Sequence, residues 1–159
     1  MCLELLLALA SEEPARDAVV DVGCGSGVLA IAAAHLGFDP VLGLDHDSES
    51  VEAALENARA NGVAVQVRRF DLRREQLPAI QGRSARASGH PIVLANLVRP
   101  LLLDLASSLA DAPGHLIASG LLANEADEIA VAFRKRLGLT ERRRRQSGEW
   151  AALWLARAP

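Results

Sequence analysis

Residues 19–27 read Val-Val-Asp-Val-Gly-Cys-Gly-Ser-Gly, and an alanine-rich stretch follows directly over 28–36. A short β-branched run that leads through a glycine-rich turn into a helix is typical of nucleotide-binding α/β folds. Because glycines carry no Cβ, backbone N–H groups at the helix N-terminus can come close to a ligand there. Asp45 ends the next apolar run, where its carboxylate is placed to bind a pair of ribose hydroxyls. The stretch predicts a cofactor that contains a nucleoside.

The glycine spacing alone fits two cofactors. Gly23, Gly25 and Gly27 form G-x-G-x-G, a pattern of proteins that bind S-adenosylmethionine (AdoMet). Gly25, Gly27 and Ala30 also satisfy the dinucleotide fingerprint G-x-G-x-x-A, with Asp45 at a suitable distance. Neither glycine pattern separates AdoMet from NAD.

Asp21, just upstream of these glycines, favours AdoMet on electrostatic grounds. A dinucleotide would place its pyrophosphate on the loop, and like charges about 4 Å apart repel by roughly 4 kcal/mol at an effective dielectric constant of about 20. AdoMet instead carries an ammonium and a sulfonium that Asp21 would attract, while its carboxylate can lie at the helix N-terminus. The charges therefore predict AdoMet, and an NAD-dependent oxidoreductase is the less favoured alternative.

The composition indicates a single domain in a reducing compartment. The chain has 159 residues, 50% of them hydrophobic, and a net charge of −3, which is enough chain for a sizeable core. Its apolar stretches are too short for a bilayer span, and no basic segment precedes the apolar N-terminus. Cys2 and Cys24 form no C-x-x-C pair, so no disulfide framework or metal site is expected. We expect a cytoplasmic protein with no membrane contact, and the negative charge argues against nucleic acid as a partner.

Hydrophobic periodicity and turn residues divide the chain into alternating strands and helices. Strands are predicted over 19–22, 40–44, 63–70, 92–95, 115–119, 140–146 and 149–156. Helices are predicted over 2–10, 28–36, 49–60, 73–80, 100–109 and 124–137. A mobile loop is predicted between the helix 73–80 and residue 90. Ser48 is the expected N-cap of the third helix, and Ser147-Gly148 the turn of a final hairpin. This pattern predicts an α/β fold with a doubly wound, mostly parallel seven-stranded sheet that ends in an antiparallel hairpin.

Polar residues follow apolar strands at Asp21, Asp45, Asp71 and Asn96. Because an open parallel sheet holds its ligand at the carboxyl ends of its strands, these side chains are expected to lie together. An aspartate after a strand is also a common turn former, so each position alone is weak evidence. Methyl transfer from AdoMet needs no metal; it needs a nucleophile aimed along the S–CH3 axis and stripped of water.

Several motifs resemble the class I AdoMet methyltransferases. They are the 21–27 loop, Gly43-Leu44-Asp45, Glu56-Asn57-Ala58 with Asn61-Gly62, and Ala95-Asn96-Leu97. More narrowly, Leu94-Ala95-Asn96-Leu97, the stretch Leu-Ile-Ala-Ser-Gly-Leu-Leu over 116–122, and Gly-Glu-Trp-Ala-Ala-Leu over 148–153 resemble the PrmA family. The similarity runs over nearly the whole chain. PrmA enzymes trimethylate a ribosomal protein of the large subunit on lysine and α-amine nitrogens.

The resemblance implies a Rossmann-like class I methyltransferase fold and a role for each motif. The cofactor-binding candidates are Asp21, Gly23, Cys24, Gly25, Gly27, Asp45, His46, Asp71, Leu72 and Asn96. By that resemblance the glycine loop and Asp21 hold the methionine end of AdoMet, Asp45 holds the ribose, and Asp71 lies near the adenine. Asn96 is the implied catalytic residue, and its amide oxygen would orient a neutral target amine.

The chain also departs from the PrmA pattern. PrmA proteins carry a separate N-terminal substrate-recognition domain and a G-T-G-x-H-x-T-T segment, which residues 1–159 do not contain. We therefore expect one methyltransferase domain over 1–159, acting on a protein amine, with a ribosomal protein as the implied acceptor. A nucleic-acid or small-molecule N-methyltransferase and an inactive domain that binds AdoMet or keeps only the fold remain alternatives. Adenine-N6 enzymes need an aromatic residue after the Asn, whereas Leu97 follows here and the chain has no Tyr.

Three other features receive structural interpretations. The arginine run 142–145 lies on a predicted edge strand, where charged side chains discourage further strand pairing. Trp150 and Trp154 would share one strand face and pack in the core. His35 is expected at the surface or as a core residue whose hydrogen bonds are satisfied, and not as a ligand.

Overall fold

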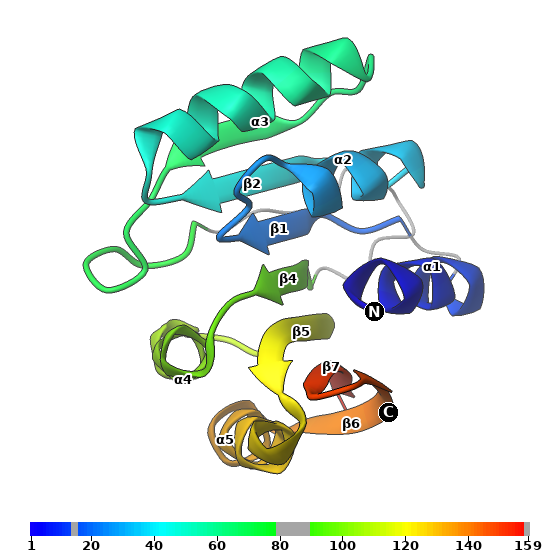
Figure 1. The fold of residues 1–159 in the computed structure, drawn as a ribbon, viewed down its shortest axis with the longest axis vertical. Coiled ribbons are helices and arrows are strands. Elements are labelled where there is room, and N and C mark those ends of the chain that lie inside the picture. Colours follow the sequence, from blue (N-terminus) through cyan, green and yellow to red (C-terminus); the bar gives the residue numbers. More distant parts are fainter. Residues whose placement is uncertain (14–15, 79–89, 158–159) are drawn as a thin grey trace.

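A seven-stranded sheet organises the part of the chain that the computed structural model describes, which is residues 1–13, 16–78 and 90–157 (Figure 1). The strands are β1 (Val19–Val22), β2 (Val41–Asp45), β3 (Gln66–Arg69), β4 (Ile92–Asn96), β5 (His115–Leu122), β6 (Leu139–Ser147) and β7 (Trp150–Arg157). Their order is β3-β2-β1-β4-β5-β7-β6. The pairs from β3 to β5 are parallel, and β7 is antiparallel to both β5 and β6. The predicted fold class, with its terminal hairpin, is confirmed.

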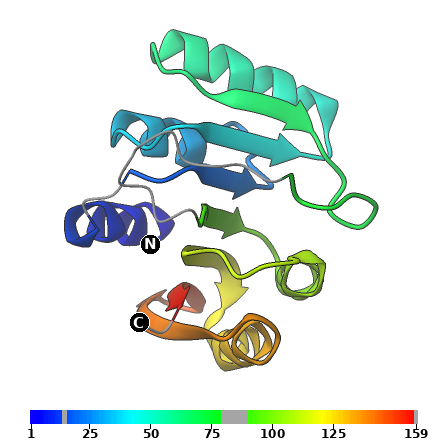
Figure 2. The same ribbon diagram turned by 180° about the vertical axis from the view of Figure 1, so that it is seen from behind.

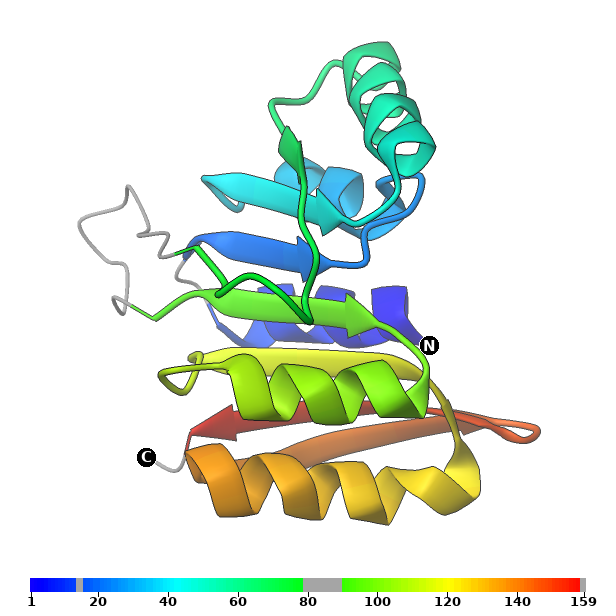
Figure 3. The same ribbon diagram turned by 90° about the vertical axis from the view of Figure 1, so that its left-hand side faces the viewer.

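Helices cover both faces of this sheet, as Figures 2 and 3 show from two other sides. They are α1 (Cys2–Glu12), α2 (Val28–His35), α3 (Ser48–Ala60), α4 (Arg99–Ser108) and α5 (Ala126–Leu137), with a short 3-10 turn η1 (Ala123–Glu125) before α5. The helices α1 and α2 pack on one face, around Trp154. On the other face lie α4 and α5, around Phe133. Because β1 and β2 are buried along their whole length, they form the two-sided interior expected of central parallel strands.

The charged residues on the edge strand β6 point to both faces. Arg143 pairs with Glu12 of α1 at 2.7 Å, and Arg144 pairs with Asp127 of α5 at 2.7 Å. Alternation along a strand explains this division between the faces. The arginine run is therefore part of a solvated edge, as predicted, and His35 is exposed.

Two helix predictions need correction. The N-cap of α3 is Asp47 and not Ser48, because the Asp47 carboxylate accepts hydrogen bonds from the backbone N–H groups of Glu49 and Ser50. The predicted helix 73–80 does not form over its described part. There, Arg73 N donates to the Asp71 carboxylate, and a single turn results that does not continue. Residues 79–89, including the end of that prediction and most of the predicted loop, lie outside the described residues.

The ends of several strands also differ from prediction. The strand β3 is shorter than the predicted 63–70, whereas β5 continues three residues past the predicted 115–119. Trp154 is buried as predicted, but the prediction for Trp150 is wrong, since 52% of its surface is exposed. Trp150 is the first residue of β7, opposite Leu122, where the hairpin extends past the helices (Figure 3).

The hairpin turn consists of Gly148 and Glu149, between the paired Ser147 and Trp150, one residue later than predicted. None of the helices formed by the described residues is long and apolar enough to cross a membrane.

Candidate functional site

The glycine-rich loop connects β1 to α2 at the carboxyl edge of the sheet. Its three glycines, Gly23, Gly25 and Gly27, all have positive φ angles. A side chain at Gly23 would collide with that of Leu97. The loop is held against β2, because the backbone N–H groups of Gly23 and Cys24 both donate to the carbonyl oxygen of Leu44, at 2.8 and 3.0 Å.

Asp45 fixes the other side of the same loop. Its Oδ2 accepts a 2.8 Å hydrogen bond from Gly25 N, and its Oδ1 accepts one of 3.0 Å from Asp47 N. The imidazole of His46 lies 3.4 Å from Oδ1 and is 83% exposed. Each carboxylate oxygen can accept more than one hydrogen bond, so Asp45 can hold the loop and still accept from hydroxyl groups of a ligand.

Asp21 is the buried charge of the site, with 1% of its surface exposed. Its Oδ2 accepts a 3.1 Å hydrogen bond from Ala30 N in the first turn of α2, whereas Oδ1 is buried with no hydrogen-bond partner. The pKa of this carboxyl is raised to about 7, mainly by burial and further by the charge of Asp45, while the hydrogen bond from Ala30 N opposes the rise. An unpartnered buried carboxylate oxygen is unfavourable by itself, and a cationic group would satisfy it.

Two cavities open on either side of the glycine loop. The β2 cavity, of about 470 Å³, is lined by Val22, Gly23, Leu44, Asp45, His46, Phe70, Asp71, Leu72, Arg73, Arg74, Leu97, Val98, Pro100 and Leu101. The α1 cavity, of about 530 Å³, is lined by Met1, Cys2, Leu3, Asp21, Gly23, Cys24, Gly25, Ser26, Val28, Leu29, Asn96 and Ser119. Gly23 lines both, so the two cavities adjoin at the loop.

The structure brings most of the predicted residues to these two cavities. Those in the β2 cavity are Gly23, Asp45, His46, Asp71 and Leu72. Those in the α1 cavity are Asp21, Gly23, Cys24, Gly25 and Asn96. Gly27 lines neither. It precedes α2, where a Cβ would lie 3.1 Å from that of Ala54, so it allows α2 and α3 to pack closely.

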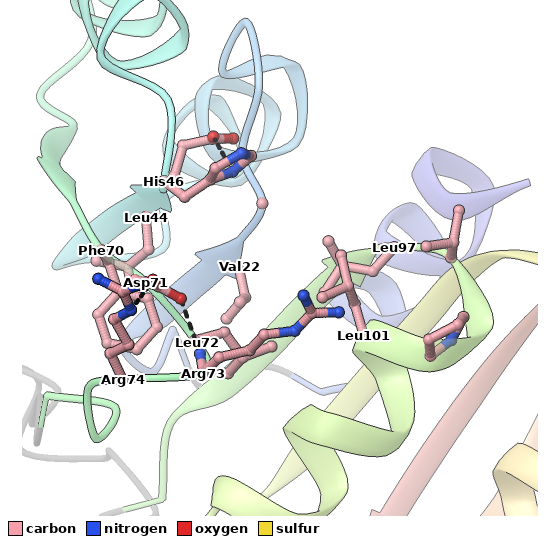
Figure 4. A pocket seen from close by; sticks show the side chains of 14 residues that line it. Val22, Leu44, His46, Phe70, Asp71, Leu72, Arg73, Arg74, Leu97 and Leu101 are labelled. Carbon is pink, nitrogen blue, oxygen red and sulfur yellow. Dashed lines mark hydrogen bonds and ion pairs between the residues drawn. The ribbon is translucent and has the colours of Figure 1, made fainter.

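Asp71 lies across the β2 cavity from α4 (Figure 4). Its Oδ1 accepts from Arg73 N at 3.0 Å, and Arg74 Nε lies 3.3 Å from Oδ2. Leu97 and Leu101 lie on the facing side, and Phe70 and Leu44 lie on the same side as Asp71. This arrangement can hold a flat aromatic group between apolar side chains, with a carboxylate at its edge.

Some residues of the site were not predicted. In the β2 cavity they are Val22, Leu44, Phe70, Arg73, Arg74, Leu97, Val98, Pro100 and Leu101. Ser119, which is buried beside Asn96 on the neighbouring strand, lines the α1 cavity. Four of them, Val22, Leu44, Phe70 and Leu97, directly adjoin a predicted polar strand end in the sequence, and this adjacency is the signal that could have identified those four.

Cys24 is an inert member of the loop. Burial, followed by the charges of Asp21 and Asp45, raises the pKa of its thiol to about 12, and a thiol is a poor nucleophile when protonated.

Asn57 supports the glycine loop from α3, where its Nδ2 donates to the carbonyl oxygen of Ser26 at 2.9 Å. Within the described residues, no group of three or more His, Cys, Asp and Glu side chains could hold a metal ion.

Comparison with known proteins identifies the family of this chain. The family profile described as "Ribosomal protein L11 methyltransferase (PrmA)" matches residues 1–158. A ribosomal protein L11 methyltransferase of Marinobacter nauticus is 42% identical over 136 residues, which are 84% of this chain and 42% of that protein. One of Syntrophotalea carbinolica is 40% identical over 157 residues, 96% of this chain and 48% of that protein.

A solved structure has the same architecture. The crystal structure of a ribosomal protein L11 methylase from Lactobacillus delbrueckii subsp. bulgaricus superposes with a TM-score of 0.77 at 30% identity, over 97% of this chain and 76% of that one. The chain spans about half the length of the curated relatives it matches. With a profile match over almost every residue, the chain belongs to the PrmA family of ribosomal protein L11 methyltransferases.

Proposed function

We propose that this chain binds AdoMet across the glycine loop and catalyses transfer of its methyl group to an amine nitrogen of a protein. The observation that carries the proposal is Asp21 Oδ1, a buried carboxylate oxygen without a partner on the wall of the α1 cavity. An ammonium group would satisfy this oxygen, and AdoMet supplies one. The family to which the chain belongs supports the same cofactor.

The residues of the two cavities suit the two ends of AdoMet. Asp45, at the boundary of the β2 cavity, would accept hydrogen bonds from the ribose hydroxyls. Phe70 and Leu101 would enclose the adenine, with Asp71 at its edge. The α1 cavity would take the methionine end, with its ammonium at Asp21 and its carboxylate at the backbone N–H groups of the loop. The buried Asp21 carboxylate beside the loop would repel the pyrophosphate of a dinucleotide.

Asn96 would orient the acceptor. When bound, AdoMet supplies a methyl group on a positively charged sulfur, and an amine lone pair can attack that methyl carbon while the sulfur leaves as a neutral thioether. Asn96 is at the exposed end of β4 and lines the α1 cavity beside Asp21 and Gly23. Its carboxamide oxygen can accept a hydrogen bond from the amine N–H and so direct the lone pair toward the loop. A lysine amine must first lose a proton, and apolar surroundings favour that by lowering its pKa.

The rim of the site favours a polypeptide acceptor over a small molecule. Five of the exposed large hydrophobic side chains lie at the carboxyl edge of the sheet: Leu3, Val28, Val98, Leu122 and Trp150. Figure 3 shows that the start of α1, the start of α4 and the β6-β7 hairpin share this edge. Exposed apolar groups gathered around a site are characteristic of a protein contact surface. The relatives are named for ribosomal protein L11, and we propose the same acceptor and a cytoplasmic location for this chain, with 1–159 as one catalytic domain.

Calorimetric titration with AdoMet tests the proposal. Wild type should bind one AdoMet, and Asp45→Ala should bind it at least tenfold more weakly, since it loses both a ribose acceptor and the anchor of Gly25. His35→Ala, on an exposed part of α2, is the matched control and should bind as wild type does. Absence of binding by wild type would refute the proposed function. Binding without methyl transfer would instead support the alternative of an inactive AdoMet-binding domain.

A further inference from the structure

The strand β5 contains a bulge next to the proposed acceptor residue. Its pairing with β7 shifts register between Ser119 and Leu121, and the residue between them, Gly120, has a φ of +79°. Bulges of this kind redirect the chain and are common beside active sites. Because Ser119 pairs with Asn96 on β4, this bulge begins where the parallel part of the sheet ends.

A side chain at Gly120 would meet the Asn96-Leu97 segment directly. A methyl group there would lie 2.8 Å from the carbonyl oxygen of Leu97, 3.0 Å from Leu97 N and 3.1 Å from Asn96 Oδ1. The Leu97 backbone has little freedom to retreat, because Leu97 N donates to the carbonyl oxygen of Ser119 at 2.9 Å. Its side chain is also confined, since it packs on Gly23 of the glycine loop. A methyl group at Gly120 would therefore force the Asn96-Leu97 segment to shift, and the Asn96 carboxamide, 3.1 Å away, would be displaced with it.

We propose that Gly120 is a positioning residue for methyl transfer, whose missing side chain lets the Asn96 carboxamide lie where it directs the acceptor amine. The inference rests on the proposed function of Asn96. Gly120 itself touches neither ligand in this scheme and acts through the Asn96-Leu97 segment that carries the Asn96 carboxamide. A change there should therefore alter turnover more than cofactor affinity, because the proposed AdoMet contacts at Asp21 and Asp45 remain in place.

The test compares Gly120→Ala with Gly138→Ala. Gly138 has a similar φ of +70°, but among the described residues no atom outside its chain neighbours lies within 4 Å of the Cβ position, so Gly138→Ala places a methyl group at a comparable positive φ without the contact. Three measurements are made on both variants: the chemical shift of the Asn96 side-chain amide, the Kd for AdoMet, and kcat for methylation of ribosomal protein L11. Gly120→Ala should shift the amide signal and lower kcat by roughly 10- to 100-fold with the Kd for AdoMet within about twofold. Gly138→Ala should change none of the three.

A double-mutant cycle separates positioning from general destabilisation. In an Asn96→Ala background the displaced carboxamide is absent, so adding Gly120→Ala should lower kcat by less than about twofold. A full additional loss in that background, or equal behaviour of the two glycine variants, would overturn the proposal. If wild type does not bind AdoMet, the proposed function fails, yet the amide shift still decides whether Gly120 controls Asn96.

Should Gly120→Ala fail to fold, the wild-type protein tests the contact itself. An NOE is expected from one Gly120 Hα to Leu97 N–H and to the Asn96 side-chain amide hydrogens, and its absence would refute the proposal.

Discussion

Replacing Asp21 by asparagine should change the pH dependence of folding and of AdoMet binding in opposite senses. The folded protein raises the pKa of this carboxyl from 3.8 to about 7, mainly through burial. The folded state therefore binds the proton more tightly than the unfolded chain. As a result, this group lowers the free energy of unfolding as the pH rises from about 4 to 7, by about 4 kcal/mol in total, and adds no slope above 7.

The Asp21→Asn variant lacks this titration. Its amide oxygen can keep the hydrogen bond from Ala30 N, and any cost of an unpartnered NH₂ group is independent of pH. The neighbouring thiols of Cys2 and Cys24 do not interfere, because burial raises both pKa values to about 12. The difference in unfolding free energy, variant minus wild type, should therefore grow with pH between 4 and 7.

Urea denaturation at intervals from pH 4 to pH 8 measures this difference. AdoMet binding gives the complementary signal, because the ammonium prefers the carboxylate form. Wild-type affinity should fall up to tenfold for each pH unit below 7, whereas Asp21→Asn should bind weakly with little pH dependence over the same range. Parallel stability curves for the two proteins between pH 4 and pH 7 would refute the reasoning about Asp21.

Three further predictions concern the acceptor rim, the loop and the core. Leu122→Ser and Trp150→Ser should each raise the KM for ribosomal protein L11 several-fold with an unchanged Kd for AdoMet. Val131→Ser, which alters an exposed apolar residue on α5, should change neither the KM nor the Kd. Equal KM values for all three variants would contradict the role of the rim. Asn57→Ala removes a hydrogen bond to the glycine loop and should weaken AdoMet binding about fivefold in calorimetry, and unchanged binding would show that the loop is held without it. Phe133→Ala removes a fully buried side chain of α5 and should lower the free energy of unfolding, measured by urea denaturation, by about 3–5 kcal/mol. A loss below about 1 kcal/mol would mean that the core repacks freely.

The sheet was predictable because its strands are short apolar runs bounded by glycines and carboxylates. Those boundaries also placed Asp45, Asp71 and Asn96 at one edge, as the structure has them. The prediction was wrong where the same sequence pattern is compatible with more than one structure. The Asp71 carboxylate caps one turn through Arg73 N, but that turn does not continue into the predicted helix over the described residues. Trp150 has the alternation of a core residue but lies beyond the covering helices.

The finer geometry of the site could not be read from sequence spacing. Asp21 was predicted as a direct partner of a cationic ligand, whereas one of its oxygens anchors α2 and only the other is unpartnered. The contact between Gly120 and Asn96 joins two strands that are neighbours only in the folded sheet. A single sequence without coordinates carries no signal for such a contact.

Methyl transfer to a protein is tested most directly by incubating the full chain with AdoMet and purified ribosomal protein L11 of Marinobacter nauticus, and weighing the product by mass spectrometry. Wild type should add methyl groups to L11. The Asn96→Ala variant should methylate L11 far more slowly than wild type, while it binds AdoMet with a Kd close to that of wild type. Equal methylation by both proteins would contradict the role of Asn96. Tight AdoMet binding by wild type with no methylated L11 would contradict the proposed activity itself.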